Sequence, residues 1–427
     1  MHCHIGGNRP MGGGNSRHDG GFAEMTATPL PSVKVADPPS GFIDQRAKSE
    51  YLRLSVGCFL VSFTAAHTTL LAIVFGRDGY DLHAIGLLLS LVAIPIIGVA
   101  LLSGEVMARL GSLATLRLAM ALTLIGFGSL LVTRSSFGPA LASRLVQGVG
   151  QGLFLAAAYT YAQSRLDPTR FLFLLGIFSA TMPLAQGVAP PVGGFVLERW
   201  GETAFFLVAT VPGIVGLLVT FGPRPLPPPA KKSGLAIASA LRPGVWEPLM
   251  CGWMNGTMMG FCGAYLAAAL VARNIPLAAF FTASLTTMFA TRLLALRGIE
   301  SVNRRLLVGS GLGLMALGLS AVAVSGTIVW PVIAGGVSFG FGYSLTYPVI
   351  SAWISDGQDA RDRAGSQALL NAAFSFGLFA MPLPETWLVA WLGYEGTLLV
   401  LAAVGFITTG ILICRLRRPT SVHSGFN

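Results

Sequence analysis

The sequence predicts an all-α membrane protein with twelve transmembrane helices arranged as two pseudo-symmetric six-helix bundles. Three observations support this fold class: the composition, the number of long apolar windows, and a correspondence between the two halves of the chain. Hydrophobic residues make up 53% of the 427 residues and charged residues only 11%. Soluble domains carry about a quarter charged residues, so this chain has too few to cover a water-facing surface.

The apolar windows are each about twenty residues long, which is the length that a helix needs to cross a bilayer. They divide the chain into a disordered cytoplasmic tail (1–50), a first bundle (51–222), a basic, Pro-rich cytoplasmic linker (223–245), a second bundle (246–414) and a cytoplasmic tail (415–427). The windows lie near 54–76, 83–103, 113–133, 138–162, 170–197, 203–222, 246–271, 275–297, 305–325, 328–354, 364–388 and 391–414.

The distribution of positive charge orients these helices. With a cytoplasmic N-terminus, 23 of the 28 Lys and Arg residues lie in cytoplasmic segments and four lie outside, and Arg144 lies inside the fourth helix. This bias predicts that both termini are cytoplasmic, in a bacterial inner (plasma) membrane. The net charge of +10 therefore reflects topology and does not indicate a nucleic-acid partner. No cleavable signal precedes the first apolar window, and Met1, Met11 or Met25 is the expected start.

An offset of 192 residues superimposes the two halves of the sequence. Such a repeat predicts two parallel bundles related by an axis along the membrane normal, with the substrate bound between them near the midplane. The matched pairs are Gly148 with Gly340, Gly150 with Gly342, Pro190 with Pro382, Gly201 with Gly393, and Gly213 with Gly405.

Three motifs, in order along the chain, resemble those of the major facilitator superfamily. "GEVMARLG" is similar to the family's loop signature at Gly104, Arg109 and Gly111, although Ala108 stands where the family has Asp. "RLVQGVG" matches the helix 4 signature at Arg144, Gln147, Gly148 and Gly150, and "APPVGG" matches an exporter-type element at Pro190, Gly193 and Gly194. The resemblance implies that conformational gating depends on Gly104, Arg109, Gly111, Gly148, Gly150, Pro190, Gly193 and Gly194. It also implies that the protein belongs to the drug and metabolite exporter-like branch of the family. It also implies that Glu105 replaces the missing Asp or that this latch is weaker.

Arg144 is the most conspicuous side chain in the predicted spans. Arg144, Gln147 and Gln151 lie on one helical face by their spacing, and a charge inside a span is a functional candidate by default. Two interpretations stay open: a structural Arg that is bonded to helices 1 and 2, and a cavity-facing Arg that binds substrate or couples transport. The offset places Gly336 opposite Arg144, so the repeat itself does not require the charge.

No acidic residue falls in the middle of a predicted span, and Glu198, Glu247 and Glu385 lie at helix ends. A cavity whose fixed charge is positive favours neutral, zwitterionic or anionic substrates over cations. His67 is the residue within a predicted span whose ordinary pKa is near neutrality, so it is the candidate for proton coupling, against a structural role between helices. Glu385 is the second candidate, against a solvated helix end.

Four further polar side chains are candidates for substrate binding: Asn255, Tyr343, Tyr347 and Asn371. The predicted function is secondary-active transport by alternating access, namely proton-coupled export of a small amphipathic neutral, zwitterionic or anionic compound. The alternatives are an uptake symporter for a small organic anion or metallophore, and a transporter-like sensor. The sequence contains no phosphate-binding loop or metal-ligand spacing, so neither an enzyme, a metal site nor a cofactor is expected. The expected protein is a monomer in the lipid bilayer, with protons and a small molecule as partners.

Overall fold

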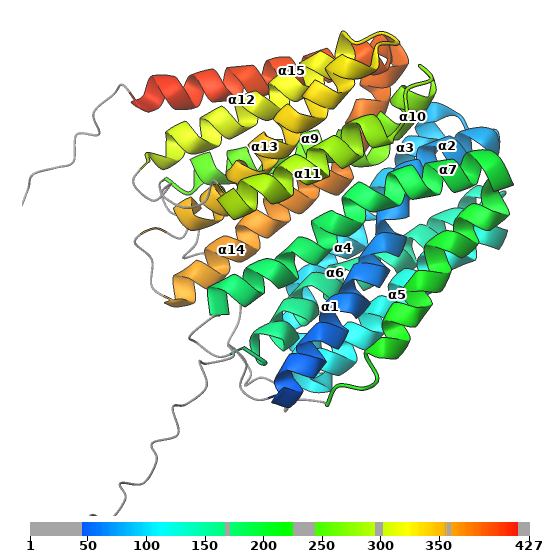
Figure 1. Cartoon of the computed structure of the whole chain (residues 1–427), viewed down its shortest axis with the longest axis vertical. Coiled ribbons are helices and arrows are strands. Elements are labelled where there is room, and N and C mark those ends of the chain that lie inside the picture. The colour runs from blue at the N-terminus through cyan, green and yellow to red at the C-terminus, as the bar shows by residue number, and fades with distance from the viewer. Residues whose placement is uncertain are drawn as a thin grey trace, which may run out of the picture. The chain divides into compact units, whose positions relative to one another are not determined.

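Helices of the computed structural model follow the predicted windows in order (Figure 1). The structure describes residues 45–166, 171–224, 244–294, 302–354, 356 and 360–416, and no β-strand occurs among them. All of these residues belong to one unit, Gly41–Asn427. The predicted linker and C-terminal tail lie largely outside the described residues, as does most of the N-terminal tail.

The described residues of the N-terminal half form eight helical elements, and several of these continue one another across short breaks. They are α1 (Gln45–Ala66), the 3-10 turn η1 (His67–Leu70), α2 (Leu71–Arg77), α3 (Leu82–Ser90), α4 (Ala93–Leu110), α5 (Ser112–Thr133), α6 (Phe137–Gln163) and α7 (Phe171–Val219).

The C-terminal half is also built from helical elements, several of which are separated only by short breaks. Its elements are α9 (Trp246–Ala264), α10 (Leu266–Val271), α11 (Ala278–Leu294), α12 (Arg304–Ala323), α13 (Val329–Ile354), α14 (Ala360–Ser375), the π-helical turn η3 (Phe376–Ala380) and α15 (Pro382–Leu416).

Six stretches of the described residues are long and apolar enough to cross a membrane by themselves. Two of them, Ile177–Val219 and Leu369–Arg415, are more than forty residues long, about twice the length that one span requires. Each is divided by a glycine with positive φ: Gly201 at φ 76° and Gly393 at φ 70°. These two residues are 192 positions apart, so the repeat reproduces the same turn between its fifth and sixth helices.

Close packing inside each half also follows the repeat. A Cβ atom on Gly148 would lie 2.9 Å from the Val92 carbonyl oxygen, and one on Gly340 would overlap the carbonyl of Ser284. Val92 and Ser284 are again 192 positions apart. Small residues at such contacts let helices approach closely, and the predicted correspondence is therefore a correspondence of helix packing.

Gly150 and Gly342 repeat the pattern on the neighbouring helix. A Cβ on Gly150 would lie 2.5 Å from the Thr123 amide nitrogen in α5, and one on Gly342 would lie 2.9 Å from the Met315 amide nitrogen in α12. Thr123 and Met315 are also related by the offset of 192. Gly148 and Gly150 thus allow α6 to approach two different helices.

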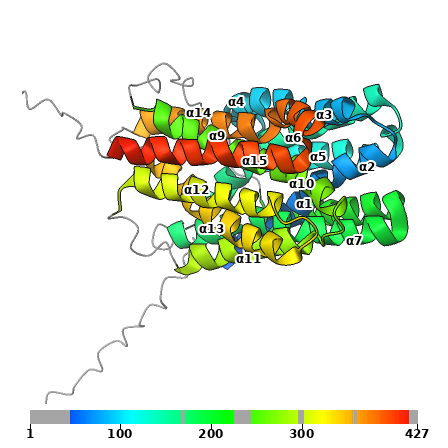
Figure 2. The same cartoon turned by 90° about the horizontal axis from the view of Figure 1, so that it is seen from above.

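The two halves contact each other along two seams. Helix α7 packs on α11, and α3 packs on α15. The two views show the elements of the C-terminal half grouped on one side and those of the N-terminal half on the other (Figures 1 and 2). Further contacts join α10 to η1 and α2, close to the ends where α2 and α10 terminate.

Helix α1 begins at Gln45, earlier than the predicted boundary at residue 51, because its first turns are anchored by polar contacts. Glu50 is buried and forms an ion pair with Arg165 at 2.9 Å. The Arg224 amide also donates to the Glu50 carboxylate at 3.3 Å. These contacts join the start of α1, the region after α6 and the region after α7, so the helix extends beyond its apolar window.

Candidate functional site

Arg144 is buried between helices, with 2% of its surface exposed. Its Nε donates to the Leu88 carbonyl oxygen at 3.1 Å, and its Nη1 donates to Gln147 Oε1. Gln147 Nε2 in turn donates to Thr68 Oγ1 at 3.2 Å. Leu88 lies in the last turn of α3, where backbone carbonyls lack a helical partner. Arg144 therefore connects α6 to α3 and, through Gln147, to η1, as the structural interpretation predicts.

The repeat explains why only one half contains this arginine. A Cβ on Gly336, the counterpart of Arg144, would lie 2.7 Å from the Phe280 carbonyl oxygen. Phe280 is the counterpart of Leu88. The C-terminal half therefore closes this junction by direct backbone approach at a glycine, whereas the N-terminal half inserts a side chain that bonds to the same carbonyl position.

His67 is fully buried at a second junction, between η1 and α7. Its Nδ1 lies 2.7 Å from the Phe63 carbonyl oxygen, so Nδ1 carries the hydrogen and donates it. Its Nε2 has no hydrogen-bond partner among the described residues. A Cβ on Gly193 would lie 2.8 Å from this nitrogen, so Gly193 provides the space for the ring. The predicted coupling residue and one of the predicted gating glycines are therefore in contact.

The other predicted gating residues occupy different environments. Arg109 is exposed and forms an ion pair with Glu105 at 3.0 Å within α4. Glu105 therefore pairs within its own helix in this structure. Gly111 ends α4 at φ 81°, a conformation that favours glycine, whereas no atom lies within 4 Å of a Cβ on Gly104. Pro190 lies inside α7, which continues through it.

Glu385 corrects an expectation from the sequence. A solvated helix end was predicted, but the side chain is buried with 1% of its surface exposed. Neither carboxyl oxygen has a hydrogen-bond partner in the described part of the chain. The position is buried because α10 and α3 cover the first turn of α15: Tyr265 Oη donates to the Pro382 carbonyl oxygen at 3.1 Å, and Thr386 packs against Gly86.

Asn255 packs between helices in this structure. It is buried, and its Nδ2 contacts Met315 Sδ at 3.7 Å. Its Oδ1 has no partner among the described residues. The side chain thus joins α9 to α12, and its predicted role in substrate binding stays a prediction.

Tyr347 and Asn371, both predicted for substrate binding, lie together. Tyr347 Oη donates to Asn371 Oδ1 at 2.6 Å, and Asn371 is exposed. Phe374 packs edge-on to the Tyr347 ring, with 5.0 Å between ring centroids. The phenol of Tyr343, one turn earlier in α13, interacts electrostatically with that of Tyr347. Helices α13 and α14 thus bring together three aromatic rings and the exposed amide of Asn371.

One side chain of α6, in the other half, interacts with this group. The phenol of Tyr159 also interacts electrostatically with that of Tyr347. Gln151, Leu155 and Tyr159 are four residues apart, so they share one face of α6, and Leu155 on that face is 44% exposed. We call Gln151, Tyr159, Tyr343, Tyr347, Asn371 and Phe374 the aromatic cleft.

Symmetry supports this grouping. The offset of 192 relates Gln151 to Tyr343 and Tyr159 to Ser351. The two faces are therefore equivalent positions of the two repeats, and a pseudo-twofold axis between the halves brings them opposite each other. Tyr159, Phe374 and the burial of Glu385 were missed in the sequence. The spacing of Tyr159 from Gln151 could have identified that residue, because both fall on the predicted polar face of the same helix.

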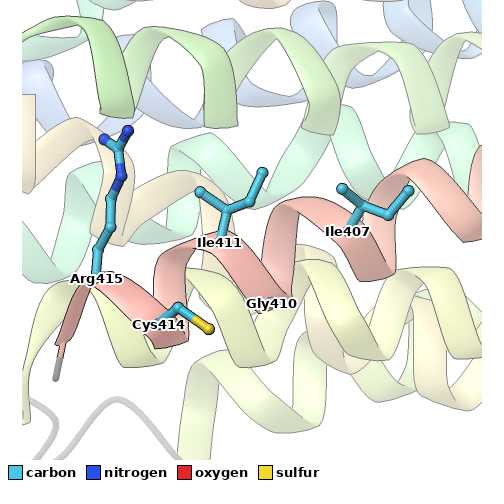
Figure 3. Close-up of a pocket in the computed structure, with 5 residues that line it drawn as sticks. All are labelled: Ile407, Gly410, Ile411, Cys414 and Arg415. Carbon is cyan, nitrogen blue, oxygen red and sulfur yellow. The ribbon is translucent and has the colours of Figure 1, made fainter.

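A shallow pocket lies elsewhere, near the end of α15. It is lined by Ile407, Gly410, Ile411, Cys414 and Arg415. In Figure 3 the side chains of Ile407, Ile411 and Arg415 point to the same side of α15, whereas Cys414 points away from them. Arg415 is paired with Glu247 at 2.6 Å. None of these residues belongs to the aromatic cleft.

Comparison with known sequences identifies the family. The sequence model of the Major Facilitator Superfamily matches residues 54–296. A methylenomycin A resistance protein of Streptomyces coelicolor is 31% identical over 86 residues, which are 19% of this chain and 17% of that protein. The uncharacterized MFS-type transporter YfiU of Bacillus subtilis is 30% identical over 149 residues, 35% of this chain and 26% of that protein. The alignments thus span about a quarter or less of these relatives.

Solved structures share the fold over most of their length. A mutant of the nucleoside transporter NupG has a TM-score of 0.72 at 13% identity, with 86% of this chain and 99% of that chain covered. A POT family transporter in complex with a thioalcohol-conjugated peptide has a TM-score of 0.71 at 14% identity, covering 85% and 95%.

The fold and the family match together define a multi-pass membrane carrier, which moves a small molecule and is not an enzyme. The chain belongs to the Major Facilitator Superfamily and is a secondary transporter of that type.

Proposed function

We propose that this transporter exports a small, neutral, amphipathic compound by alternating access, in exchange for protons. The similarity to a resistance protein supports export, as does the exporter-type element at Pro190, Gly193 and Gly194. We place the carrier, as a monomer, in a bacterial plasma membrane with both termini cytoplasmic, on the basis of the positive-charge bias.

This orientation assigns one end of the molecule to the cytoplasmic side of the membrane and the other end to the outside. The inner end contains the α4–α5 turn at Gly111, and the outer end contains Asp78, Arg134 and Glu202. Arg134 forms ion pairs with both acids and so joins the α2–α3 loop to the end of α5 and to the break at Gly201 inside α7. The contacts of α10 with η1 and α2 are at the outer end. On this orientation, the contacts of α10 with η1 and α2 support our assignment of the structure to a state that is closed on the outside.

The aromatic cleft is the observation that carries the proposed substrate class. It draws on both halves, it includes the exposed Asn371 amide, and all six of its side chains are uncharged. Aromatic rings with polar tips suit a ligand that has an apolar body and a few hydrogen-bonding groups. A compound of this kind would lie between α6, α13 and α14 and be released when the halves rock apart on the outer side.

The buried position of Arg144 argues against the alternative of an organic-anion importer. An anion would need the guanidinium in the cleft, but Arg144 bonds to Leu88 and Gln147 in the interior of the first bundle. We assign Arg144 and Gln147 to joining helices. His67 keeps the proton-coupling role, since its Nε2 is a free acceptor that a small movement of α7 would uncover.

A flux assay in proteoliposomes with imposed pH and voltage gradients tests the proposal. Three probes separate the substrate classes: chloramphenicol is neutral, tetraphenylphosphonium is a cation and salicylate is an anion. We expect pH-driven movement of chloramphenicol against the proton gradient and little movement of the two ions. Tyr347→Phe removes the hydrogen bond to Asn371 and should reduce this flux.

Tyr80→Phe is the matched control, because Tyr80 Oη donates to the Arg134 carbonyl oxygen at the outer end, away from the cleft. Equal loss of flux in both variants would contradict a binding role for Tyr347. Transport of salicylate alone would favour the anion importer, and no flux of any probe under any gradient would favour a sensor. Unchanged pH-driven flux in His67→Ala would remove the coupling role of that residue.

A further inference from the structure

Glu385 lies at the outer seam between the two halves. Thr386, the next residue of α15, packs directly against Gly86 of α3, in the other half. The Tyr265 phenol, at the break between α9 and α10, contacts Thr386 Oγ1 at 2.5 Å. The first turn of α15, which contains the buried Glu385, therefore takes part in a contact between the two halves.

The repeat shows that this seam has two equivalent parts. Gly194 in α7 and Thr386 in α15 are 192 positions apart. A Cβ on Gly194 would lie 2.6 Å from Leu277 Cδ1 of the opposite half, just as Thr386 meets Gly86. Both seams must separate when the transporter opens outward, and opening of the second one admits water to the first turn of α15.

The same offset relates Glu385 to Gly193. Gly193 contacts His67 and Leu70, and the counterpart of Leu70 is Cys262, whose thiol interacts electrostatically with Glu385. The two junctions are thus equivalent in the fold but differ in chemistry. One contains an imidazole that faces a glycine, and the other contains a carboxyl group among neutral side chains.

Among the described residues, no hydrogen-bond donor reaches either carboxyl oxygen of Glu385. From α9 and α10 the titratable groups that interact with it are the Cys262 thiol and the Tyr265 phenol. Tyr394 lies further along α15, where it interacts with Tyr265, and the titratable His83 of α3 is exposed. Burial of a carboxylate without a donor is very costly, whereas burial of a neutral carboxyl group costs much less. Closure of the seam therefore requires the carboxyl group to be neutral.

We propose that Glu385 is a proton-binding site that controls closure of the outer seam. The proposal rests on the proposed function for the orientation that makes this seam the outer one. In the outward-open state the carboxylate is in water and ionised. It takes one proton from the outer solution, the neutral group is buried as α3 closes on α15, and reopening returns the proton to water. An inward proton gradient would thereby favour return to the state shown in Figure 1.

Distances between spin labels at the outer end test this site without any substrate. Ser135→Cys and Thr327→Cys place labels on exposed outer positions of the two halves, in the full-length chain with its five native cysteines replaced. Pulsed electron resonance in nanodiscs then measures the ratio of closed to open molecules from about pH 5 to about pH 8. One linked proton changes this ratio by up to about tenfold per pH unit, and the open fraction rises with pH.

Glu385→Gln should stay closed across the whole range, and Glu385→Ala gives a second neutral variant should the first fail to fold. Glu198→Gln is the matched control, because Glu198 is exposed near the outer end of α7, and it should behave like the wild type. A wild-type pH response that persists in Glu385→Gln would overturn the proposal, and its loss in His67→Ala instead would assign the response to His67. If no probe is transported but the closed-to-open ratio still responds to pH through Glu385, the proposed function is refuted and the proton-binding site is not.

Discussion

Replacement of Gly86 by Ala tests the contact on which closure of the outer seam depends. A Cβ at this position would overlap Thr386 Oγ1 and lie 3.0 Å from Thr386 Cβ and 3.1 Å from Thr386 Cγ2. Overpacking of this kind costs about 1–3 kcal/mol. Because the overlap exists only in the closed state, the closed-to-open ratio should fall about 5- to 150-fold.

The label pair Ser135→Cys and Thr327→Cys measures this ratio directly. Gly98→Ala is the matched control: a Cβ on Gly98, in α4, has no atom within 4 Å. Both changes gain the same helix propensity, about 1 kcal/mol, so the difference between them isolates the steric effect.

A double-mutant cycle with Thr386→Ala makes the test specific. Removal of Oγ1 and Cγ2 leaves only the 3.0 Å contact with Thr386 Cβ, so Gly86→Ala should be largely rescued in the double variant. Thr386→Ala alone also removes the contact with Tyr265, and its own effect is subtracted in the cycle. The reasoning is refuted if Gly86→Ala and Gly98→Ala show equal closed fractions, or if the cycle shows no coupling between residues 86 and 386.

Three further predictions concern stability and selectivity, all measured on detergent-solubilised protein unless stated. Gly201→Ala and Gly393→Ala should each cost about 1–3 kcal/mol, because their backbone conformations are nearly exclusive to glycine. Gly104→Ala, inside α4, should instead gain about 1 kcal/mol of helix propensity; equal melting temperatures for all three would contradict this. Arg144→Met should lower the melting temperature, because it leaves the Leu88 carbonyl without its donor. The preference for neutral over anionic probes in liposomes should stay unchanged. A switch in that preference would place Arg144 in the binding site. Burial raises the pKa of Asp78 above its ordinary value of 3.8, with Arg134 opposing the rise and Glu202 adding to it. The folded state therefore binds this proton more tightly than the unfolded state, and the free energy of unfolding should fall as the pH rises through the window just above 3.8. Asp78→Asn should flatten this dependence of stability on pH in thermal unfolding curves, and an unchanged dependence would contradict the assignment.

Much of the fold could be predicted from the sequence because the bilayer imposes one-dimensional constraints. Span length, positive-charge bias and the 192-residue offset are all properties of the chain order, and the equivalent turns at Gly201 and Gly393 confirm the repeat. The candidate site was predicted only in part. Tyr343, Tyr347, Asn371 and Gln151 fall on or near the cleft, but Asn255 and Arg144 are buried between helices. Polarity within a span identifies an unusual residue, but it does not indicate which neighbour satisfies that residue.

The sequence by itself determined the class of this protein: a helical membrane carrier built from two repeats, with a charge, a histidine and close-packing glycines in its first half. The tertiary structure decided what these residues contact. It showed that Arg144 bonds to the carbonyl of Leu88, that the phenols of Tyr159 and Tyr347 interact electrostatically although they belong to different halves, and that Glu385 is buried next to Thr386, which packs against Gly86. The reason is physical: insertion into a membrane depends on the transfer free energy of each segment alone, whereas burial and hydrogen bonding depend on which segments come together.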